Sequence, residues 1–597
     1  MTRIYSPTQL ALFSISRLGA WWEEYDKANR VLSFPEPTEL EKRLMLEGDD
    51  HEKMLMEKFR KEGKSIVDIG KLNLSKEDKF IKTIEFMKEG IDIISQGALK
   101  NKIIRGNADF LYRVEQPSNL GDWSYEPIEC KLSSKSKTTF LIQACCYCDL
   151  LENILGRKPK LFHLYLGGGS KLSDNIFKFS DFEDWYNQLK SQYKQFIDNF
   201  DPNKEPDIFP GNHGKWTTFI EKELSRRKDL SLVAGMNKYQ RHRLIEQSIN
   251  TIDEFAKYDL EKILVSKEDP LINLQKQAKA QVHPKNKDGT SYYEWIEIKE
   301  DEQIKSLPPP NKGDVWFDME SCNNAITGNK LEYLFGASYK DKKDNLSFKA
   351  WWAHDPFQEE KSFKDWVKWI EDRRSIKEYK DLHIYHYGHY EKAAMRQLQE
   401  KYTGCSDQID EWLRSGLLVD LLPIVKASMY LGEEGYSIKN VEKIYPSKYT
   451  KKFKFKRSAD VSNAVESIIE YELWKESGEK IFIDGELNQK LKKIEEYNEI
   501  DCKSTLILHE FLVDSKSQNP INPLSFKYKY EDTRRPVIRS LYVFDEADSF
   551  KKNSPKRYPI VKINDSIYQS EKVIYNDNIG IGIEVYDRQS AKNYNRN

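Results

Sequence analysis

The chain has 597 residues, with charged residues at 32% and a net charge of only -1. At about 100 to 200 residues per domain, this length excludes a single core and predicts three or four domains. A net charge near zero gives no general attraction to phosphate, so any nucleic-acid partner must be held by local basic patches.

The cysteines and the amino terminus favour a reducing, cytoplasmic location. Seven cysteines in a chain of this size form no disulfide-like framework. Met1–Pro7 has no apolar core of signal-peptide length, and no run of 18 apolar residues occurs. We therefore expect a cytoplasmic protein with no membrane partner.

Residues 1–205 begin with helical patterns and continue with short β-branched and aromatic strands. Glu129 and Lys131 lie two apart on one predicted strand, so they share a face, and Asp109 comes from a neighbouring strand. Two such carboxylates can hold a metal ion that polarises a phosphate, while the lysine stabilises developing negative charge. His51 adds a nitrogen ligand. Gln143 and Tyr147, four apart on the next helix, can position a nucleic-acid strand.

Four motifs occur here in order: Gly48–His51, Gly106–Asp109, Glu129–Lys131 and Gln143–Tyr147. Together they resemble the motifs of RecB-like nucleases of the PD-(D/E)XK superfamily. The resemblance implies a restriction-endonuclease-like α/β fold and cleavage of DNA with Mg²⁺ or Mn²⁺.

Some of these relatives carry an iron–sulfur cluster held by one early and three late cysteines. Phe13–Ser16 stands where the early cysteine is expected, and Cys145, Cys146 and Cys148 share the Gln143 helix without a fourth partner. We therefore expect buried thiols on a helix and no cluster.

Residues 206–310 predict a helical, highly charged connector. Within it, Gly235–Ile252 resembles a helix-hairpin-helix-like unit, with Ser248 where the turn glycine is expected. Such a unit binds DNA backbone or spaces two domains. Pro284–Gly289 is typical of disorder, and Pro308–Pro310 of a linker.

Residues 311–516 alternate strands with helices, which predicts an α/β domain. Residues 517–597 change to short alternating segments, a β-rich tail that is a candidate start of a further domain. The predicted elements of the α/β domain are strands at 314–320, 331–339, 346–353 and 383–387 and helices near 359–377, 390–402 and 486–513.

A second acidic set lies in this domain. Asp318 and Glu320 have the same parity on a strand, so both carboxylates lie on one face. Tyr497 and Asp501 are four apart on a helix, one turn apart on the same side. Oxygen ligands of this kind hold hard divalent cations, and a nearby phenol can orient a water molecule.

These residues resemble the motifs of DEDD exonucleases of the RNase H-like superfamily. Asp318 and Glu320 match the first motif, with Asp318 as the bridging ligand, and Tyr497 with Asp501 matches the tyrosine version of the last. The best match to the middle motif follows the strand 383–387 and puts Glu391 where the family has aspartate. Asp420 is the competing candidate for that ligand.

A basic segment interleaves lysines with aromatic rings. On a strand, this alternation would put the cations on one face and the rings on the other, a surface that could follow a phosphate backbone or be an ordinary solvated strand. Its candidate nucleic-acid-binding residues are Lys452, Lys454, Lys456 and Arg457.

The function predicted from these patterns is a Mg²⁺- or Mn²⁺-dependent deoxyribonuclease with a RecB-like site and a DEDD-type 3′–5′ exonuclease-like site. Its expected substrate is single-stranded DNA, in repair, processing or defence, with a helicase in the same pathway. One alternative is a nucleic-acid-binding scaffold in which one or both sites are inert. Another is the front part of a longer helicase-nuclease.

Overall fold

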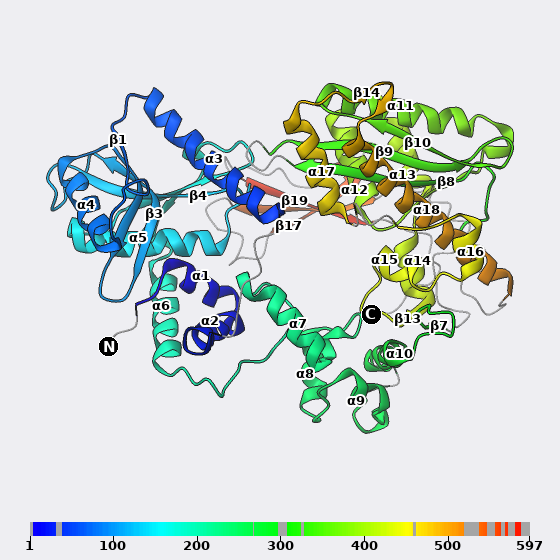
Figure 1. The fold of residues 1–597 in the computed structure, drawn as a ribbon, viewed down its shortest axis with the longest axis horizontal. Helices are drawn as coiled ribbons and strands as arrows, with labels where there is room; N and C mark the ends of the chain where they lie inside the picture. Colours follow the sequence, from blue (N-terminus) through cyan, green and yellow to red (C-terminus); the bar gives the residue numbers. More distant parts are fainter. Residues whose placement is uncertain are drawn as a thin grey trace. The chain divides into compact units, whose positions relative to one another are not determined.

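The computed structural model describes residues 4–30, 39–266, 268–296, 307–323, 328–457, 461, 463–518, 537–545, 556–562, 568–570 and 579–586. The chain divides into two compact units, Met1–Ser525 and Phe526–Asn597. The elements are a mixture of helices and mixed or antiparallel sheets, as expected for a multidomain α/β protein (Figure 1).

The first part of the larger unit contains the helices α1 (Pro7–Ile15), α2 (Arg17–Asn29), α3 (Glu39–Lys61), α4 (Lys76–Glu89), α5 (Thr138–Leu155) and α6 (Glu183–Asp198). Its strands are β1 (Ile66–Asp68), β2 (Ile93–Lys100), β3 (Arg105–Val114), β4 (Ser124–Lys131), β5 (Leu161–Leu166) and β6 (Ile176–Lys178).

These strands form one sheet in the order β1-β2-β3-β4-β5-β6, antiparallel from β2 to β4 and parallel between β4 and β5. Helix α5 connects the parallel pair, as a crossover requires. Side chains alternate between two cores, so Phe110 packs with Leu55 and Phe59 of α3, while Leu111 packs with the α5 side. The sheet is therefore covered by α3 on one face and by α5 on the other.

The connector contains α7 (Thr217–Arg227), α8 (Lys238–Ile245), α9 (Ile252–Lys257), α10 (Leu271–Val282) and the strand β7 (Tyr293–Trp295). Between α8 and α9 the backbone turns at Ser248 with a φ of 61°. This left-handed conformation favours glycine, so serine here adopts the turn for which the sequence suggested a glycine.

The rest of the larger unit contains the strands β8 (Val315–Asn323), β9 (Lys330–Lys340), β10 (Leu346–Trp352), β11 (Ile384–His386), β12 (Leu418–Asp420), β13 (Met429–Leu431), β14 (Phe482–Ile483) and β15 (Glu486–Leu487). Its helices are α11 (Pro356–Arg374), α12 (Tyr390–Lys401), α13 (Ser406–Ser415), α14 (Leu421–Ser428), α15 (Ile438–Glu442), α16 (Ser447–Lys452), α17 (Ala464–Ser477) and α18 (Gln489–Gln518).

The main sheet of this part has the order β10-β9-β8-β11-β12. Strands β8 to β10 form an antiparallel meander, and β11 and β12 run parallel to β8. Phe317 points into a core shared with α11 to α13, and its neighbour Trp316 points into a core shared with α14 and α18. Helix α18 therefore covers one face of the sheet along β8 and β9 (Figure 1).

Two segments differ from the sequence expectations. The stretch Pro284–Gly289 leads into a closed turn, in which the Asn286 amide donates to the Thr290 carbonyl at 2.9 Å. Strand β7 then pairs antiparallel with β13, and Leu307, just before the three prolines, is buried in the α18 core. The described parts of the predicted linker are therefore held to the α/β domain, through the β7–β13 pair before residue 297 and through Leu307 after residue 306.

The smaller unit contains β16 (Val537–Asp545), β17 (Lys556–Lys562), β18 (Tyr568–Ser570) and β19 (Ile579–Tyr586). They form an antiparallel sheet in the order β18-β17-β16-β19. The described part of the tail is therefore β-structured, as its alternating pattern predicts.

Candidate metal centre

Strand β8 and helix α18 bring three carboxylates together. Asp318 and Glu320 leave the same face of β8, and Asp501 reaches them from α18, which covers that face. One oxygen from each carboxylate lies within 4.8 Å of the others, and this is the one group of three or more His, Cys, Asp or Glu side chains with such spacing among the described residues. Carboxylate oxygens in this arrangement could hold a hard divalent cation.

Two neutral side chains hold these carboxylates in place. Asn498 Nδ2 donates a hydrogen bond of 2.7 Å to Asp318 Oδ2, and Ser467 Oγ donates one of 3.1 Å to Glu320 Oε2. Asn498 is fully buried against Gly336 of β9, where an added Cβ would lie 1.6 Å from Asn498 Oδ1. The missing side chain at Gly336 therefore makes the space that lets Asn498 reach Asp318.

We expect Gly336→Ala to disturb this site through Asn498. The added methyl group cannot coexist with the amide, so the fold should lose about 1–3 kcal/mol by overpacking. Mn²⁺ affinity, measured by calorimetry, should fall as well because Asp318 loses its donor. Gly48→Ala is the control, since nothing lies within 4 Å of a Cβ added there.

In a double-mutant cycle, Asn498→Ala should relieve much of the stability loss caused by Gly336→Ala. Strictly additive losses of unfolding free energy would contradict the proposed contact between the two residues.

The electrostatics favour a bound cation. Burial raises the pKa of Asp318 well above its usual range, and the neighbouring charges of Asp501, Glu320 and Glu391 raise it further. Burial and Asp501 also raise the pKa of Glu320 to about 8, and burial raises the pKa of Asp501. Buried carboxylates that repel one another in this way are stabilised in their charged form by a cation.

Tyr497 and Arg457 flank Asp501. The Tyr497 hydroxyl hydrogen-bonds the Asp501 carboxylate, and burial together with the charge of Asp501 raises the pKa of this phenol. Arg457 Nη2 lies 2.6 Å from Asp501 Oδ1, and its Nε donates to Glu442 at 2.7 Å. Arg457 therefore faces the acidic group, where it compensates Asp501.

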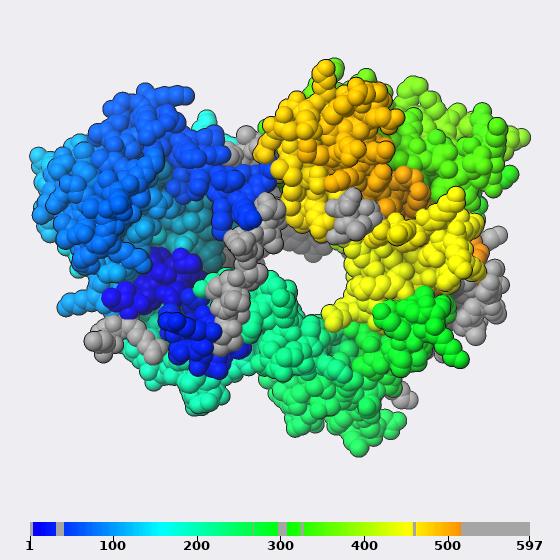
Figure 2. Space-filling view, in the orientation of Figure 1, coloured from blue at the N-terminus to red at the C-terminus, as the bar shows by residue number. Residues whose placement is uncertain are grey.

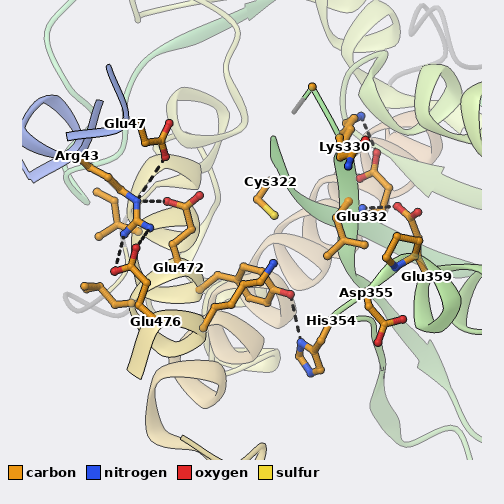
Figure 3. Close-up of a pocket in the computed structure, with 18 of the residues that line it drawn as sticks. Arg43, Glu47, Cys322, Lys330, Glu332, His354, Asp355, Glu359, Glu472 and Glu476 are labelled. Carbon is orange, nitrogen blue, oxygen red and sulfur yellow. Dashed lines mark hydrogen bonds and ion pairs between the residues drawn. The ribbon is translucent and has the colours of Figure 1, made fainter. Parts of the chain in front are cut away.

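Glu391 lies at the start of α12, directly after β11, which pairs with β8. Its carboxylate is buried and lies 3.1 Å from His386 Nδ1. The preceding Tyr390 donates to Glu332 at 2.9 Å, and Lys330 pairs with Glu332 at 2.6 Å beside a cavity of about 1340 Å³ (Figure 3). This network fixes the beginning of α12, and with it the backbone of Glu391.

Asp420, the competing candidate, has a capping role. It is the N-cap of α14, and its Oδ1 accepts from the amides of Leu422 and Gly388, each at 2.9 Å. We therefore expect Glu391→Gln to suppress cleavage with little loss of stability, because glutamine keeps an acceptor for His386 but loses the charge. Asp420→Ala should instead cost about 1 kcal/mol of stability as a lost cap.

Thermal unfolding and steady-state cleavage of the two variants separate these roles. A fully active Glu391→Gln variant would contradict the assignment of Glu391 as a ligand.

In the β1–β6 sheet, the predicted lysine and carboxylates are neighbours. Lys131 Nζ lies 2.5 Å from Glu129 Oε1 and 3.8 Å from Asp109 Oδ2. Asp109 Oδ2 also accepts from the Cys130 amide at 2.8 Å. Burial, and then the charge of Asp109, raises the pKa of Glu129 to about 8. The ammonium group of Lys131 therefore lies between the buried Glu129 and the half-buried Asp109.

The other predicted residues of this set have defined partners. His51 Nε2 lies 3.2 Å from the Tyr165 carbonyl, and its ring stacks on Tyr165. Gln143 donates to Thr8 at 3.3 Å, and the Tyr147 hydroxyl donates to the Asn107 carbonyl at 2.6 Å. Their assigned roles remain predictions. The thiols of Cys145, Cys146 and Cys148 are buried on α5.

The expectation of a strand at the basic segment is wrong. Helix α16 ends at Lys452, and the chain then turns, with a φ of 48° at Lys454. The lysines nevertheless point outward, because the alternating Phe453 and Phe455 pack against the α18 core. Lys452, Lys454 and Lys456 are exposed, and Lys452 pairs with Glu510 of α18.

A family model described as the RNase H superfamily matches residues 315–513. No curated protein matches the chain. The matched range runs from β8 to α18 and contains Asp318, Glu320 and Asp501, so the chain includes an RNase H-like domain with an acidic group suited to metal. Such a domain indicates a nuclease or hydrolase that acts on nucleic acid. None of the described helices is long and apolar enough to cross a membrane.

Sequence reasoning missed the residues that support the carboxylates. Asn498 lies beside Tyr497 and three residues before Asp501, a helical spacing that could have indicated it. Gly336 of β9 pairs with Asp318 of β8, and Ser467 lies on α17, 147 residues after Glu320. No local pattern connects them to the site.

Proposed function

We propose that this chain is a divalent-metal-dependent nuclease that hydrolyses DNA phosphodiester bonds. The observation that supports it most is the group formed by Asp318, Glu320 and Asp501 inside an RNase H-like domain. In this proposal the group forms a DEDD-type site, with Glu391 as the fourth acid, and removes nucleotides from 3′ ends. Acids that repel one another away from solvent destabilise the fold when no cation is bound, so such a group indicates a functional site.

Each residue has a role in this proposal. Asp318, Glu320 and Asp501 would hold the divalent cations, with Asp318 as the proposed shared ligand, and Asn498 fixes the orientation of the Asp318 carboxylate. Tyr497 orients the attacking water through its hydroxyl, which is hydrogen-bonded to the Asp501 carboxylate. Divalent cations bound to these oxygens would supply Lewis-acid stabilisation of the charge that develops on the phosphate.

The amino-terminal sheet would provide a second, RecB-like hydrolytic site. Lys131, beside Asp109 and Glu129, would stabilise the negative charge that develops on the scissile phosphate. The order β2-β3-β4 followed by the crossover helix α5 supports this assignment, because Asp109 on β3 lies beside the strand β4 that carries Glu129 and Lys131.

Single-stranded DNA is the proposed substrate. The exposed Lys452, Lys454 and Lys456 precede Arg457, which touches the acidic group, so cations extend from the protein surface to the site. Such a series can follow one phosphate backbone without reading its sequence.

The test uses matched DNA and RNA single strands that carry a label at the 5′ end, with either a free or a blocked 3′ end. With Mn²⁺ present, we expect a ladder of shortened DNA products from the free 3′ end. The Asp109→Asn/Lys131→Ala background isolates the RNase H-like site. Equal ladders from blocked and free ends in that background would contradict the 3′–5′ assignment.

A further inference from the structure

Helix α3 brings a carboxylate to the amino-terminal site that the sequence motifs do not include. Glu52 follows His51 on α3, and its Oε2 accepts a hydrogen bond of 3.1 Å from Gln96 Nε2. The Gln96 side chain also hydrogen-bonds Asp109. An amide nitrogen has two donors, so one residue of β2 can link the carboxylates of Glu52 and Asp109.

Gln96 achieves this contact through an unusual backbone. Its φ is 52°, and the ladder between β2 and β3 passes from the Ser95–Phe110 pair to the Gly97–Ala108 pair without Gln96 and Asp109. A residue other than glycine is strained in this conformation, and such strain gathers at functional sites. The irregularity turns the Gln96 amide toward the two acids.

The surroundings leave negative charge that Lys131 alone cannot balance. Glu52, Asp109 and Glu129 provide three carboxylates against one ammonium group. Glu129 is 2% exposed, and its Oε2 is buried without a hydrogen-bond partner in the described part of the chain. The ligand oxygens of these three acids do not all lie within 4.8 Å of one another in the structure, and a hard cation with oxygen ligands would draw them together.

His51, by contrast, faces Tyr165. Its ring stacks on that tyrosine with centroids 4.3 Å apart, and its Nε2 meets the Tyr165 carbonyl. Of the two consecutive α3 residues, Glu52 is therefore the one whose side chain is linked to Asp109. Figure 2 shows α3 at the surface of this part of the chain, and the Glu52 side chain is half-buried.

We propose that Glu52 is a carboxylate ligand of a divalent cation at the amino-terminal site, together with Asp109 and Glu129, and that Gln96 is the positioning residue that holds Glu52 beside Asp109. This inference rests on one part of the proposed function, the second hydrolytic site in the β1–β6 sheet. Lys131 compensates the acids before the ion enters.

The test measures Mn²⁺ binding to the full-length chain by electron paramagnetic resonance and calorimetry. The background carries Asp318→Asn and Asp501→Asn, which removes the ligands of the RNase H-like site. We expect Glu52→Gln to weaken the remaining Mn²⁺ binding by tenfold or more and Glu52→Asp to restore part of it. Glu57→Gln, an exposed acid on the same helix, should change nothing.

Gln96→Gly separates the backbone from the amide. Glycine accepts a φ of this sign, so thermal stability should be kept or raised, while Mn²⁺ affinity should fall severalfold. A purely structural role for Gln96 would instead lower the melting temperature and leave Mn²⁺ affinity unchanged.

The outcomes distinguish this inference from the proposed function. Unchanged Mn²⁺ affinity in Glu52→Gln would overturn the ligand assignment even if the background still cleaves DNA. Lost Mn²⁺ binding in Glu52→Gln, with no DNA cleavage by the background, would support the metal site and contradict nuclease function there. No Mn²⁺ binding by the background at all would overturn both the ligand assignment and the proposed amino-terminal hydrolytic site, and would leave the RNase H-like site untouched.

Discussion

Asp318→Asn is expected to abolish exonuclease activity of the RNase H-like site, and Asp501→Ala to do the same. Removing a ligand loses several kcal/mol of transition-state stabilisation, which is a fall in rate on the order of 10³-fold. Asparagine keeps the shape of the side chain and an acceptor for Asn498, so the loss cannot be attributed to unfolding. Steady-state cleavage in the Lys131→Ala background and calorimetric titration with Mg²⁺ measure the two effects.

Stability should move in the opposite direction to activity. Burial and the charges of neighbouring acids raise the pKa of Asp318, so neutralising it removes repulsion from the fold without metal. We expect a melting temperature about 2–4 °C higher in chelator, equivalent to about 1 kcal/mol for a domain of this size. Unchanged Mg²⁺ binding in Asp318→Asn would contradict its role as the shared ligand.

Tyr497→Phe is the matched control for the same site. This substitution removes the hydroxyl that hydrogen-bonds Asp501 and leaves all the carboxylate ligands in place. Cleavage should fall by about 10²-fold while metal affinity is retained, because the phenol orients water and does not hold the ion.

Lys131→Ala is expected to remove cleavage by the amino-terminal site. In the Asp318→Asn background, the residual rate should fall by about 10²–10³-fold, because the ammonium group meets charge that develops in the transition state. Mn²⁺ binding should be kept, since the lysine is a competitor of the ion for Glu129 and Asp109 and not a ligand. The two measurements are made on the full chain.

A residual rate in Lys131→Ala equal to that of the background would end the assignment of Lys131. Loss of Mn²⁺ binding together with a lower melting temperature would indicate that the lysine acts only as a structural partner of Glu129.

The parts of the sites that depend on local periodicity could be predicted. The two-residue spacing of Asp318 and Glu320 on a strand, and the four-residue spacing of Tyr497 and Asp501 on a helix, place their side chains through backbone geometry alone. The pairing of β11 with β8 brings Glu391 close to Asp318, and this pairing follows from the α/β order of the segment.

Contacts between distant elements could not be predicted in this way. The space at Gly336 that admits Asn498 depends on how α18 packs on β9, and no pattern within β9 distinguishes this glycine from any other. Gln96 reaches Glu52 and Asp109 through a single residue with positive φ, which a strand pattern conceals. Both features arise from tertiary packing.

In the basic segment, the predicted alternation of exposed and inward-facing side chains is present, but the predicted secondary structure is wrong. Exposed lysines alternate with half-buried rings from Lys452 to Arg457, yet α16 and a turn replace the expected strand. Phe453 and Phe455 pack against the α18 core and so determine which side chains face outward. The same alternation can therefore arise in a helix end and a turn as well as in a strand.

The most direct test of the central claim is a comparison of single-stranded DNA cleavage by the wild-type chain and by an Asp318→Asn/Lys131→Ala variant, each with Mn²⁺ and with chelator. We predict cleavage by the wild-type chain only when Mn²⁺ is present, and none by the double variant, which should still bind DNA. DNA binding without cleavage by the wild-type chain in Mg²⁺ or Mn²⁺, or equal cleavage by the double variant, would contradict the account.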